Sequence, residues 1–473
     1  MFLHEAVAIS IVALMSFASP DEAGPPRPGE HDADNGEAKA IAEDAANPAS
    51  DRPRVVSTEP EHGEDGVAID LAQIVVTFDR PMTVGSHSWV GGGELFPELA
   101  GEPTWIDDRT AALPVRLRPD SDYQLAINST RFDNFRGADG APAIPMPLVF
   151  STREWPMPTH VKEIGIERLR DALLRRYSYR DRLGIDWKTR LAAYEPKLRE
   201  VDSSLRFAAL VSEMVAPAED PHLWVKARSL TLPNDWRERR ERRRDLTTNF
   251  EGRAVGSVVG PAVEQHGRGV ISANIGPDVG YILIPVWGAS TGEAALAALE
   301  SLEDVGSLII DVRPNGGGAE AEAARFAGAF VTAPVVYAKR RHIDPATGEI
   351  SEPLDAVLEP HETTATRPRR VYVLVGPTTM SSCEGFCLMM RAAGAELVGE
   401  RTAGSSGNPQ PVRVGGGILM YVPSWIALDA EGHPLEGIGI EPDVVIETDP
   451  ADLATTDPVL AQTLERAKAA AQP

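Results

Sequence analysis

The chain changes its pattern of hydrophobic and polar residues several times, and each change marks a different kind of structure. Residues 54–154 contain short apolar runs with partial alternation, such as QIVVTFDRPM and YQLAINST, separated by Gly, Pro, Asp and Asn. Alternation with a period of two places one side of a strand in a core, and several such strands within about 100 residues are typical of a β-sandwich. We therefore predict an N-terminal β-sandwich over residues 54–154.

The rest of the chain has the patterns of helices and of buried strands. In residues 155–245, apolar positions recur every three or four residues, as in IERLRDALLRRY and LRFAALVSEMV, which predicts helices. In residues 246–450, strand-like runs (VGYILIPVW, SLIIDVRP, PVVYAKRR, RVYVLVGP) alternate with helix-like segments. This alternation predicts an α/β domain with an internal sheet. Residues 451–473 are predicted to end in a helix with Asp457 as its N-cap and Pro458 at its first position.

The first 53 residues have neither pattern. Residues 1–18 combine a short apolar stretch with small residues before a plausible cleavage position, and we interpret them as a secretory signal peptide that is too short to span a membrane. Residues 19–53 are rich in Asp, Glu, Ala, Pro and Gly, which predicts a disordered acidic linker. We therefore expect export to the periplasm, the extracellular space or the cell surface, with no membrane span after removal of the signal.

Charge and cysteine content exclude several classes of function. The net charge is −24 at pH 7, and no basic face is evident to balance it, so a nucleic-acid partner is not expected. The two cysteines, Cys383 and Cys387, provide no disulfide framework, and no cluster in the sequence has convincing metal-ligand spacing. We predict no metal and no cofactor.

Two turns that follow apolar runs could carry chemistry. In LVGPTTMSSCEGFCLMM, a strand, a tight turn and a helix place Ser381, Ser382 and Cys383 at a helix N-terminus. Unpaired N–H groups there favour negative charge, so a hydroxyl can act as a nucleophile if a base lies beside it, although serine is also a common N-cap. In IIDVRPNGGG, glycines could bring backbone N–H groups close to a ligand, or form only a flexible turn.

The order and spacing of three segments are more specific than any one of them. LIIDVRPNGGG, VYVLVGPTTMSSCEGFCLMMRAAGAELVGERTAG and LEGIGIEPDVVIE together resemble the carboxy-terminal-processing (tail-specific) and tricorn-type serine peptidases. The resemblance covers roughly residues 160–473 and implies the crotonase-like ββα-spiral fold. It also implies that Ser381, three residues before Glu384, is the nucleophile, and that the backbone N–H groups of Gly317 and Ser382 form the oxyanion hole.

The base follows from a departure from the tail-specific pattern. Those peptidases use a lysine in a Thr-x-Gly-Lys turn, but this chain reads RTAGSSGNPQ, with Ser405 at that place, and its only lysine after Ser381 is Lys468. Tricorn-type peptidases use a histidine from a short motif in the preceding helical region. The segment EDPHLWVK is similar to that motif, so the resemblance implies His222 as the base.

The group that orients His222 stays open. The resemblance implies Glu436, just before the closing Gly-x-x-Pro-Asp, as the orienting glutamate. The tricorn-type tetrad also has a serine directly before the histidine, where this chain has Pro221, whose side chain cannot form a hydrogen bond. Asp220, Glu436 or a water could then orient His222.

The sequence therefore predicts an exported serine endopeptidase that cleaves protein or peptide substrates through an acyl-enzyme, with a Ser–His mechanism and not a Ser–Lys mechanism. The alternatives are a catalytically inactive peptide- or ligand-binding protein on the same fold and, less favoured, a cysteine peptidase that uses Cys383. His342 is a competing base. Residues 54–154, through STEPEHGEDGVAID, IVVTFDRPM and the closing FST, resemble bacterial Ig-like domains, which implies a spacer or a module that binds a partner. The sequence does not fix the oligomeric state.

Overall fold

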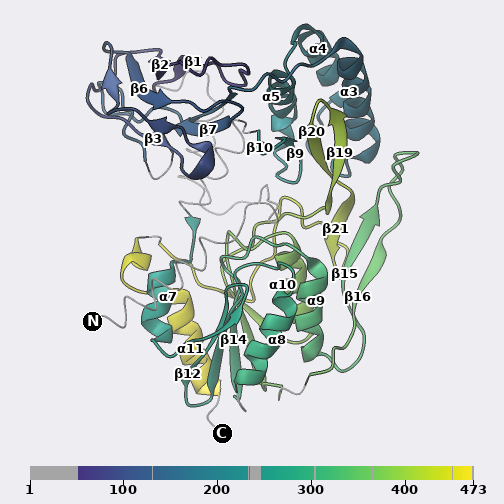
Figure 1. Cartoon of the computed structure of the whole chain (residues 1–473). Coiled ribbons are helices and arrows are strands. Elements are labelled where there is room, and N and C mark those ends of the chain that lie inside the picture. The colour runs from purple at the N-terminus through teal and green to yellow at the C-terminus, as the bar shows by residue number, and fades with distance from the viewer. Residues whose placement is uncertain are drawn as a thin grey trace.

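The computed structural model describes residues 52–129, 132–232, 234, 247–302, 305–363, 367–449 and 451–470. The predicted signal peptide and nearly all of the predicted acidic linker lie outside these residues. Among the described helices, none combines the length and the apolar character that crossing a membrane requires. The described chain forms an upper part, made of a β-sandwich and a group of helices, and a lower part built around a large sheet (Figure 1).

The β-sandwich spans residues 55–151 and consists of two antiparallel sheets that share one core. One sheet has the order β1-β2-β6-β4 with β5 paired to β6, and the other has the order β3-β7-β8. In β2 and β7 every second residue is buried, as the alternating sequence predicted. The strands are β1 (Val55–Glu59), β2 (Gln73–Phe78), β3 (Trp89–Val90), β4 (Glu98–Leu99), β5 (Thr104–Trp105), β6 (Thr110–Arg116), β7 (Asp122–Ile127) and β8 (Met146–Ser151).

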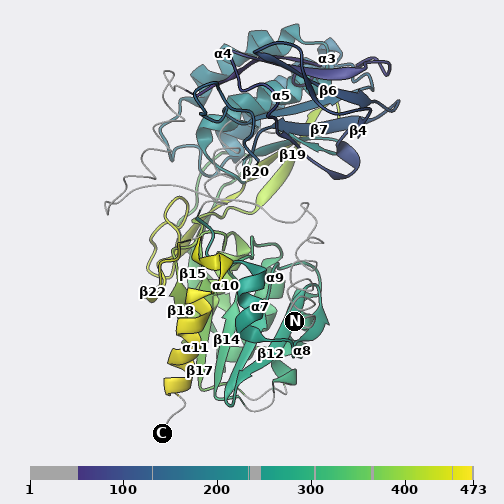
Figure 2. The same cartoon turned by 90° about the vertical axis from the view of Figure 1, so that its left-hand side faces the viewer.

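The helical part includes a four-stranded antiparallel sheet, and two of its strands come from residues 409–423, far along the chain. Its helices are α3 (Thr159–Asp171), α4 (Trp187–Glu200) and α5 (Ser204–Val215), and the strands β9 (Trp224–Ala227) and β10 (Leu230–Thr231) follow them. β9 pairs with β20 (Ile418–Pro423), which pairs with β19 (Pro409–Gly415). Figure 2 shows β19 and β20 rising from the lower part toward these helices. This sheet therefore joins the helical part, predicted for residues 155–245, to the α/β domain predicted for residues 246–450.

The β-sandwich packs directly on the helical part. Arg206 of α5 donates from Nη1 to the His62 carbonyl oxygen at 2.7 Å. Gly63, with φ of 81°, lies so close to α5 that a Cβ there would be 3.2 Å from the Ala209 Cβ. Trp155, directly after the sandwich, is only 1% exposed and belongs to the core of the helical part.

The lower part is built on a seven-stranded sheet with the order β11-β12-β13-β14-β17-β18-β22. From β13 onward all neighbours are parallel, so the carboxyl ends of β14 and β17 lie side by side. The strands are β11 (Glu264–Gly267), β12 (Val270–Gly276), β13 (Val279–Leu283), β14 (Ser307–Asp311), β17 (Arg370–Val375), β18 (Glu396–Gly399) and β22 (Val444–Val445). This arrangement confirms the predicted α/β domain.

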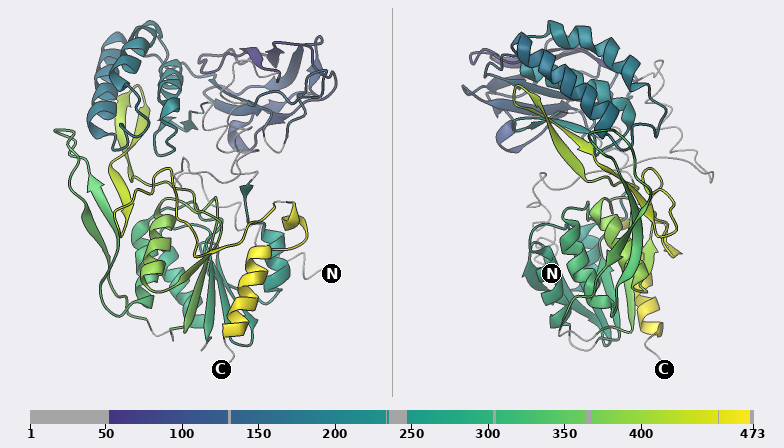
Figure 3. Two further views of the ribbon diagram at one scale, coloured as in Figure 1. Left: turned by 180° about the vertical axis from the view of Figure 1, so that it is seen from behind. Right: turned by 90° about the vertical axis from the view of Figure 1, so that its right-hand side faces the viewer.

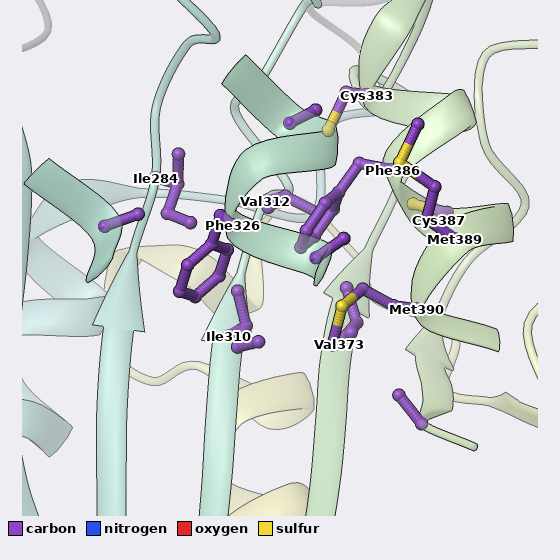
Figure 4. Close-up of a cluster of buried hydrophobic side chains, with 14 of the residues drawn as sticks. Ile284, Ile310, Val312, Phe326, Val373, Cys383, Phe386, Cys387, Met389 and Met390 are labelled. Carbon is purple, nitrogen blue, oxygen red and sulfur yellow. The ribbon is translucent and has the colours of Figure 1, made fainter. Parts of the chain in front are cut away.

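Helices cover both faces of this sheet. The larger core lies under α8 (Thr291–Ser301), α9 (Glu320–Ala327) and α10 (Ser382–Ala392), and the second lies under α7 (Gly252–Val259) and α11 (Pro458–Ala470). Figure 3 shows α11 and α7 on the face away from α10. In the larger core, Phe326 and Phe386 stack with ring centroids 6.1 Å apart, and side chains of α10 point down onto the strands (Figure 4).

One predicted strand belongs elsewhere. The run PVVYAKRR was interpreted as a buried strand of the internal sheet, but β15 (Val335–His342) forms a separate sheet with β16 (Leu354–Leu358) and β21 (Trp425–Asp429). Only Tyr337 and Ala338 of β15 are buried, and the strand belongs to a three-stranded sheet that is separate from the seven-stranded sheet. The prediction was therefore wrong about the place and the burial of this strand.

A buried ion network joins the end of β14 to the last helix. Arg313, fully buried, donates to Asp311 Oδ2 at 2.6 Å and to Asp457 Oδ2 at 2.8 Å. Asp457 Oδ1 also accepts the Leu460 N–H at 2.9 Å, which confirms the predicted N-cap. The network fixes the strand that leads into the glycine-rich turn.

Candidate active site

Ser381 lies in the turn between β17 and α10, with an unusual backbone conformation. Its φ is 57° and its ψ is −130°, a region that costs a non-glycine residue about 1–3 kcal/mol. The conformation is held because its N–H donates to the Ser405 carbonyl oxygen at 2.9 Å and to Glu384 Oε2 at 3.2 Å. The turn thus presents the Ser381 hydroxyl at the N-terminus of α10.

Glu384 connects this turn to the loop that follows β18. The side chain is fully buried. Its Oε1 accepts from Thr402 Oγ1 and from the Gly404 N–H, both at 2.6 Å, and its Oε2 accepts the Ser405 N–H at 2.6 Å. With the bond from Ser381, one buried carboxylate receives four hydrogen bonds, as a buried charge requires. In the sequence, Glu384 served only to mark the position of the expected nucleophile, and these bonds were not predicted.

The glycine-rich turn lies against Ser381, as the family resemblance implied. Gly317 has φ of 107°, and a Cβ there would lie 2.7 Å from the Ser381 Cβ, so only glycine fits. Its N–H, however, donates to Asn315 Oδ1 at 2.8 Å. The turn thus uses this donor in the present conformation, and a role of the Gly317 N–H in an oxyanion hole stays a prediction.

Two neighbouring N–H groups are unoccupied. Neither the Gly318 N–H nor the Ser382 N–H forms a hydrogen bond with any residue that the structure describes. The Ser382 hydroxyl donates to the Gly318 carbonyl oxygen at 2.9 Å, which ties the glycine-rich turn to α10. The structure thus gives the Ser382 side chain a role that the sequence did not indicate.

His222 reaches Ser381 from the helical part, 159 residues earlier in the chain. Its Nε2 lies 3.1 Å from Ser381 Oγ, a hydrogen-bond distance. Its Nδ1 lies 2.9 Å from Ser405 Oγ, so the imidazole is held between two hydroxyls. The residue that contacts Nδ1 was missed as an orienting group, although the sequence did single out Ser405 as the residue in place of a lysine.

Asp220 holds His222 through its backbone. Asp220 Oδ1 accepts the His222 N–H at 2.8 Å, a local turn that Asp often forms, and Oδ2 accepts the Tyr177 hydroxyl at 2.8 Å. Burial raises the pKa of Asp220 to about 6, and the nearby Arg182 opposes this increase. Asp220 therefore orients the loop that carries the imidazole, by way of the main chain.

Glu436 lies beside this group without a direct hydrogen bond to the imidazole. Its Oε2 accepts the Ser406 N–H at 2.8 Å, and its buried Oε1 has no partner among the described residues. Burial, followed by the nearby Asp220 carboxyl, raises the pKa of Glu436 well above its ordinary value. The hydrogen bond that Glu436 accepts goes to the backbone beside Ser405, and its role in orienting His222 stays a prediction.

The remaining candidates lie away from this arrangement. His342 is exposed at the end of β15, with its ring edge-on to Trp425. Cys383 and Cys387 are free and buried in the core beneath α10 (Figure 4), and burial raises the pKa of the Cys383 thiol well above its ordinary value. A thiolate nucleophile at Cys383 is therefore disfavoured.

One group of possible metal ligands, unexpected from the sequence, lies on the surface after β21. Ligand atoms of Asp429, Glu431 and His433 lie within 4.8 Å of one another. Glu431 and His433 are exposed, and His433 Nδ1 pairs with Asp429 Oδ2 at 2.9 Å. Exposed acidic groups are common without a metal, so we assign no site there.

Comparison with known proteins identifies the family of one domain. Residues 278–446 match the family model described as peptidase family S41. The chain carries a peptidase family S41 domain. It is therefore a serine-type peptidase. The S41 domain includes Gly317, Ser381, Ser405 and Glu436, whereas His222 lies before the matched residues.

Solved structures similar to the chain include several peptidases. A Parabacteroides merdae protein described as a peptidase is 19% identical to this chain, with a TM-score of 0.54. The match covers 65% of this chain and 96% of that one. At this identity the likeness concerns the fold alone. Mature CPAF in complex with lactacystin is 14% identical with a TM-score of 0.49, over 65% of this chain and 98% of that one. The tricorn protease has a TM-score of 0.43 at 14% identity, over 85% of this chain and 54% of that one.

Proposed function

We propose that this S41 peptidase is an exported endopeptidase in which Ser381 is the nucleophile and His222 is the base. The observation that carries the proposal is the distance of 3.1 Å between His222 Nε2 and Ser381 Oγ. The two residues come from different parts of the fold and meet at the carboxyl ends of β14 and β17, where open α/β sheets commonly place their sites. Parallel pairing of these strands brings the glycine-rich turn to the same place.

The arrangement supports acyl transfer by a Ser–His mechanism. His222 Nε2 would accept the proton of Ser381 Oγ as the oxygen attacks the peptide carbonyl carbon, and would then return it to the leaving amine. The same base would activate the water that hydrolyses the acyl-enzyme. The turn that carries lysine in tail-specific peptidases has Ser405 instead, and Lys468 pairs with Glu465 on the exposed side of α11.

The oxyanion would be stabilised at the N-terminus of α10. The Ser382 N–H lies at the first helical position and has no partner among the described residues, and the helix dipole there also favours negative charge. We propose the Gly318 N–H as the second donor, in place of the expected Gly317. Rotation of the Asn315 side chain could add the Gly317 donor. Loss of one such donor typically lowers the rate by about 10²–10³-fold.

We also propose a crotonase-like ββα spiral for the α/β domain and an Ig-like domain for residues 54–154. The latter is supported by two antiparallel sheets that share a core. Its surface is a candidate for binding a partner. Export is supported by the sequence pattern of residues 1–18, and N-terminal sequencing of the secreted protein would test it, since a retained Met1 would contradict cleavage.

A serine-directed fluorophosphonate probe tests the nucleophile and separates the enzyme from an inactive binding protein. We expect one labelled serine, Ser381, by peptide mapping, and we expect hydrolysis of an unstructured protein substrate. Ser381→Ala should abolish both, with little change in the thermal midpoint. Cys383→Ala is the matched control two residues away, and it should keep labelling because the thiol is buried. Labelling that persists in Ser381→Ala would contradict the assignment, and an unlabelled wild-type protein would favour the binding protein.

A further inference from the structure

We propose that Ser405 is the positioning residue of the catalytic base: its hydroxyl holds the Nδ1 side of His222, while its backbone holds the nucleophile turn. The proposal rests on the proposed Ser381–His222 mechanism. It assigns a neutral hydroxyl to a place for which the sequence left Asp220, Glu436 or a water open.

Ser405 is attached to the site at three points. Its Oγ lies 2.9 Å from His222 Nδ1, its N–H donates to Glu384 Oε2 at 2.6 Å, and its carbonyl oxygen accepts the Ser381 N–H at 2.9 Å. The residue is fully buried. One residue therefore sets the separation between the nucleophile, the base and the first turn of α10.

The contact at Nδ1 determines what Nε2 can do. A neutral imidazole has one N–H and one lone pair. If Nδ1–H donates to Ser405 Oγ, the lone pair on Nε2 faces Ser381 and can accept its proton. When the imidazolium forms, both of its N–H groups then have an acceptor. In this arrangement the Ser405 hydroxyl stabilises the productive tautomer and the protonated base.

The nearby carboxyl groups support the backbone on either side of this contact. Asp220 accepts the His222 N–H, and Glu436 accepts the Ser406 N–H. Both are buried, so they fix the two loops that bring the imidazole and the Ser405 hydroxyl together. This explains why Pro221, directly before the base, is compatible with catalysis: the orienting serine comes from a different loop.

The test compares two substitutions that differ in what they preserve. Ser405→Ala removes the hydroxyl. Ser405→Cys keeps nearly the same shape but offers only a weak acceptor. We expect both to lower kcat and the rate constant of fluorophosphonate labelling by about 10- to 100-fold, as expected for a hydrogen bond to a charged group, with a small change in KM. If shape alone mattered, Ser405→Cys would recover the wild-type rate, and the proposal would fail.

Two further measurements separate positioning from a structural role. The midpoint of the acidic limb of kcat/KM should move to lower pH in Ser405→Ala, because the imidazolium loses an acceptor while Asp220, Glu436 and Glu384 remain. Ser406→Ala is the matched control, since its hydroxyl pairs with the Tyr179 hydroxyl at 3.0 Å, and its effect on the labelling rate should be much smaller. An equal effect of the two alanine substitutions, or an unchanged midpoint, would overturn the proposal.

Nitrogen NMR of His222 shows which ring nitrogen carries the proton, so it tests the role of Ser405 without measuring catalytic activity. Above the midpoint, the ¹⁵N shifts of the wild-type imidazole should show the proton on Nδ1, and Ser405→Ala should show a larger share of the Nε2–H tautomer. A wild-type proton on Nε2 would refute the proposal even if the enzyme is active. A wild-type protein that is not labelled, but has the proton on Nδ1, would refute the proposed function and not the role of Ser405.

Discussion

Glu384→Gln is the substitution that should disturb the site most without removing a reacting group. It preserves the size of the side chain and replaces one carboxylate oxygen with an NH₂ group. The Oε2 position receives the N–H groups of Ser381 and Ser405 at 3.2 and 2.6 Å. The Oε1 position receives Thr402 Oγ1 and the Gly404 N–H at 2.6 Å. In either orientation the new NH₂ group therefore faces at least one N–H donor.

The expected cost can be estimated from the better orientation. If the amide nitrogen takes the Oε1 position, the Thr402 hydroxyl can rotate to accept, but the Gly404 N–H is left buried without a partner. Losing one charge-assisted hydrogen bond costs about 1.5–3 kcal/mol, and the bonds to the other oxygen weaken when the charge is removed. We expect a loss of roughly 3 kcal/mol in the free energy of unfolding. Displacement of the Ser381 turn should lower kcat/KM by about 100-fold, the effect of a misplacement near 1 Å.

Denaturant unfolding, followed by tryptophan fluorescence, and hydrolysis of an unstructured protein substrate would measure both effects. Glu396→Gln is the matched control, because Glu396 is partly exposed and pairs with Arg466 at 2.9 Å on the surface. It should change the free energy of unfolding by less than about 1 kcal/mol. The reasoning would be refuted if Glu384→Gln matched the control in both stability and kcat/KM.

Three further substitutions or truncations test other parts of the structure. Burial raises the pKa of Asp220 from 3.8 to about 6, so ionisation of Asp220 destabilises the wild-type fold as pH rises through that window. The thermal midpoint of Asp220→Asn minus that of wild type should therefore increase between about pH 4 and pH 7. A difference that stays constant would contradict this. Cys383→Ala with Cys387→Ala should keep most hydrolytic activity, since both thiols are buried; an inactive but folded double variant would restore a thiol role. A chain that begins at Glu154 should fold and hydrolyse a peptide. A chain that begins at Pro156 should be less stable, because it lacks the buried Trp155. Similar thermal midpoints of the two truncated chains would show that Trp155 is not needed.

The sequence predicted the local features of the site better than its long-range contacts. The strand–turn–helix around Ser381 follows from an apolar run, a turn and a helix start, which are properties of neighbouring residues, whereas the place of Gly317 beside Ser381 came from the family resemblance. The pairing of His222 with Ser381 across 159 residues came only from a family resemblance. Apolar periodicity carries no information about which distant loop supplies the base.

The features that the sequence could not predict depend on how distant segments pack. Ser405 orients His222 because β20, close after Ser405, pairs with β9, close after His222, and no pattern within either segment indicates that pairing. The use of the Gly317 N–H by Asn315 is a side-chain hydrogen bond within a turn, which a spacing argument cannot detect. β15 has the apolar content of a buried strand, but it pairs with β16 and β21 outside the main sheet.

The central claim is that His222 is the base that activates Ser381. The most direct measurement is the rate constant for fluorophosphonate labelling of Ser381 in wild type, His222→Ala and His342→Ala, taken from about pH 5 to pH 9. We predict a single acidic limb in this profile for wild type and for His342→Ala. His222→Ala should be slower by orders of magnitude and should lack this limb. A His222→Ala variant that labels at the wild-type rate, or a His342→Ala variant that does not label, would contradict the account.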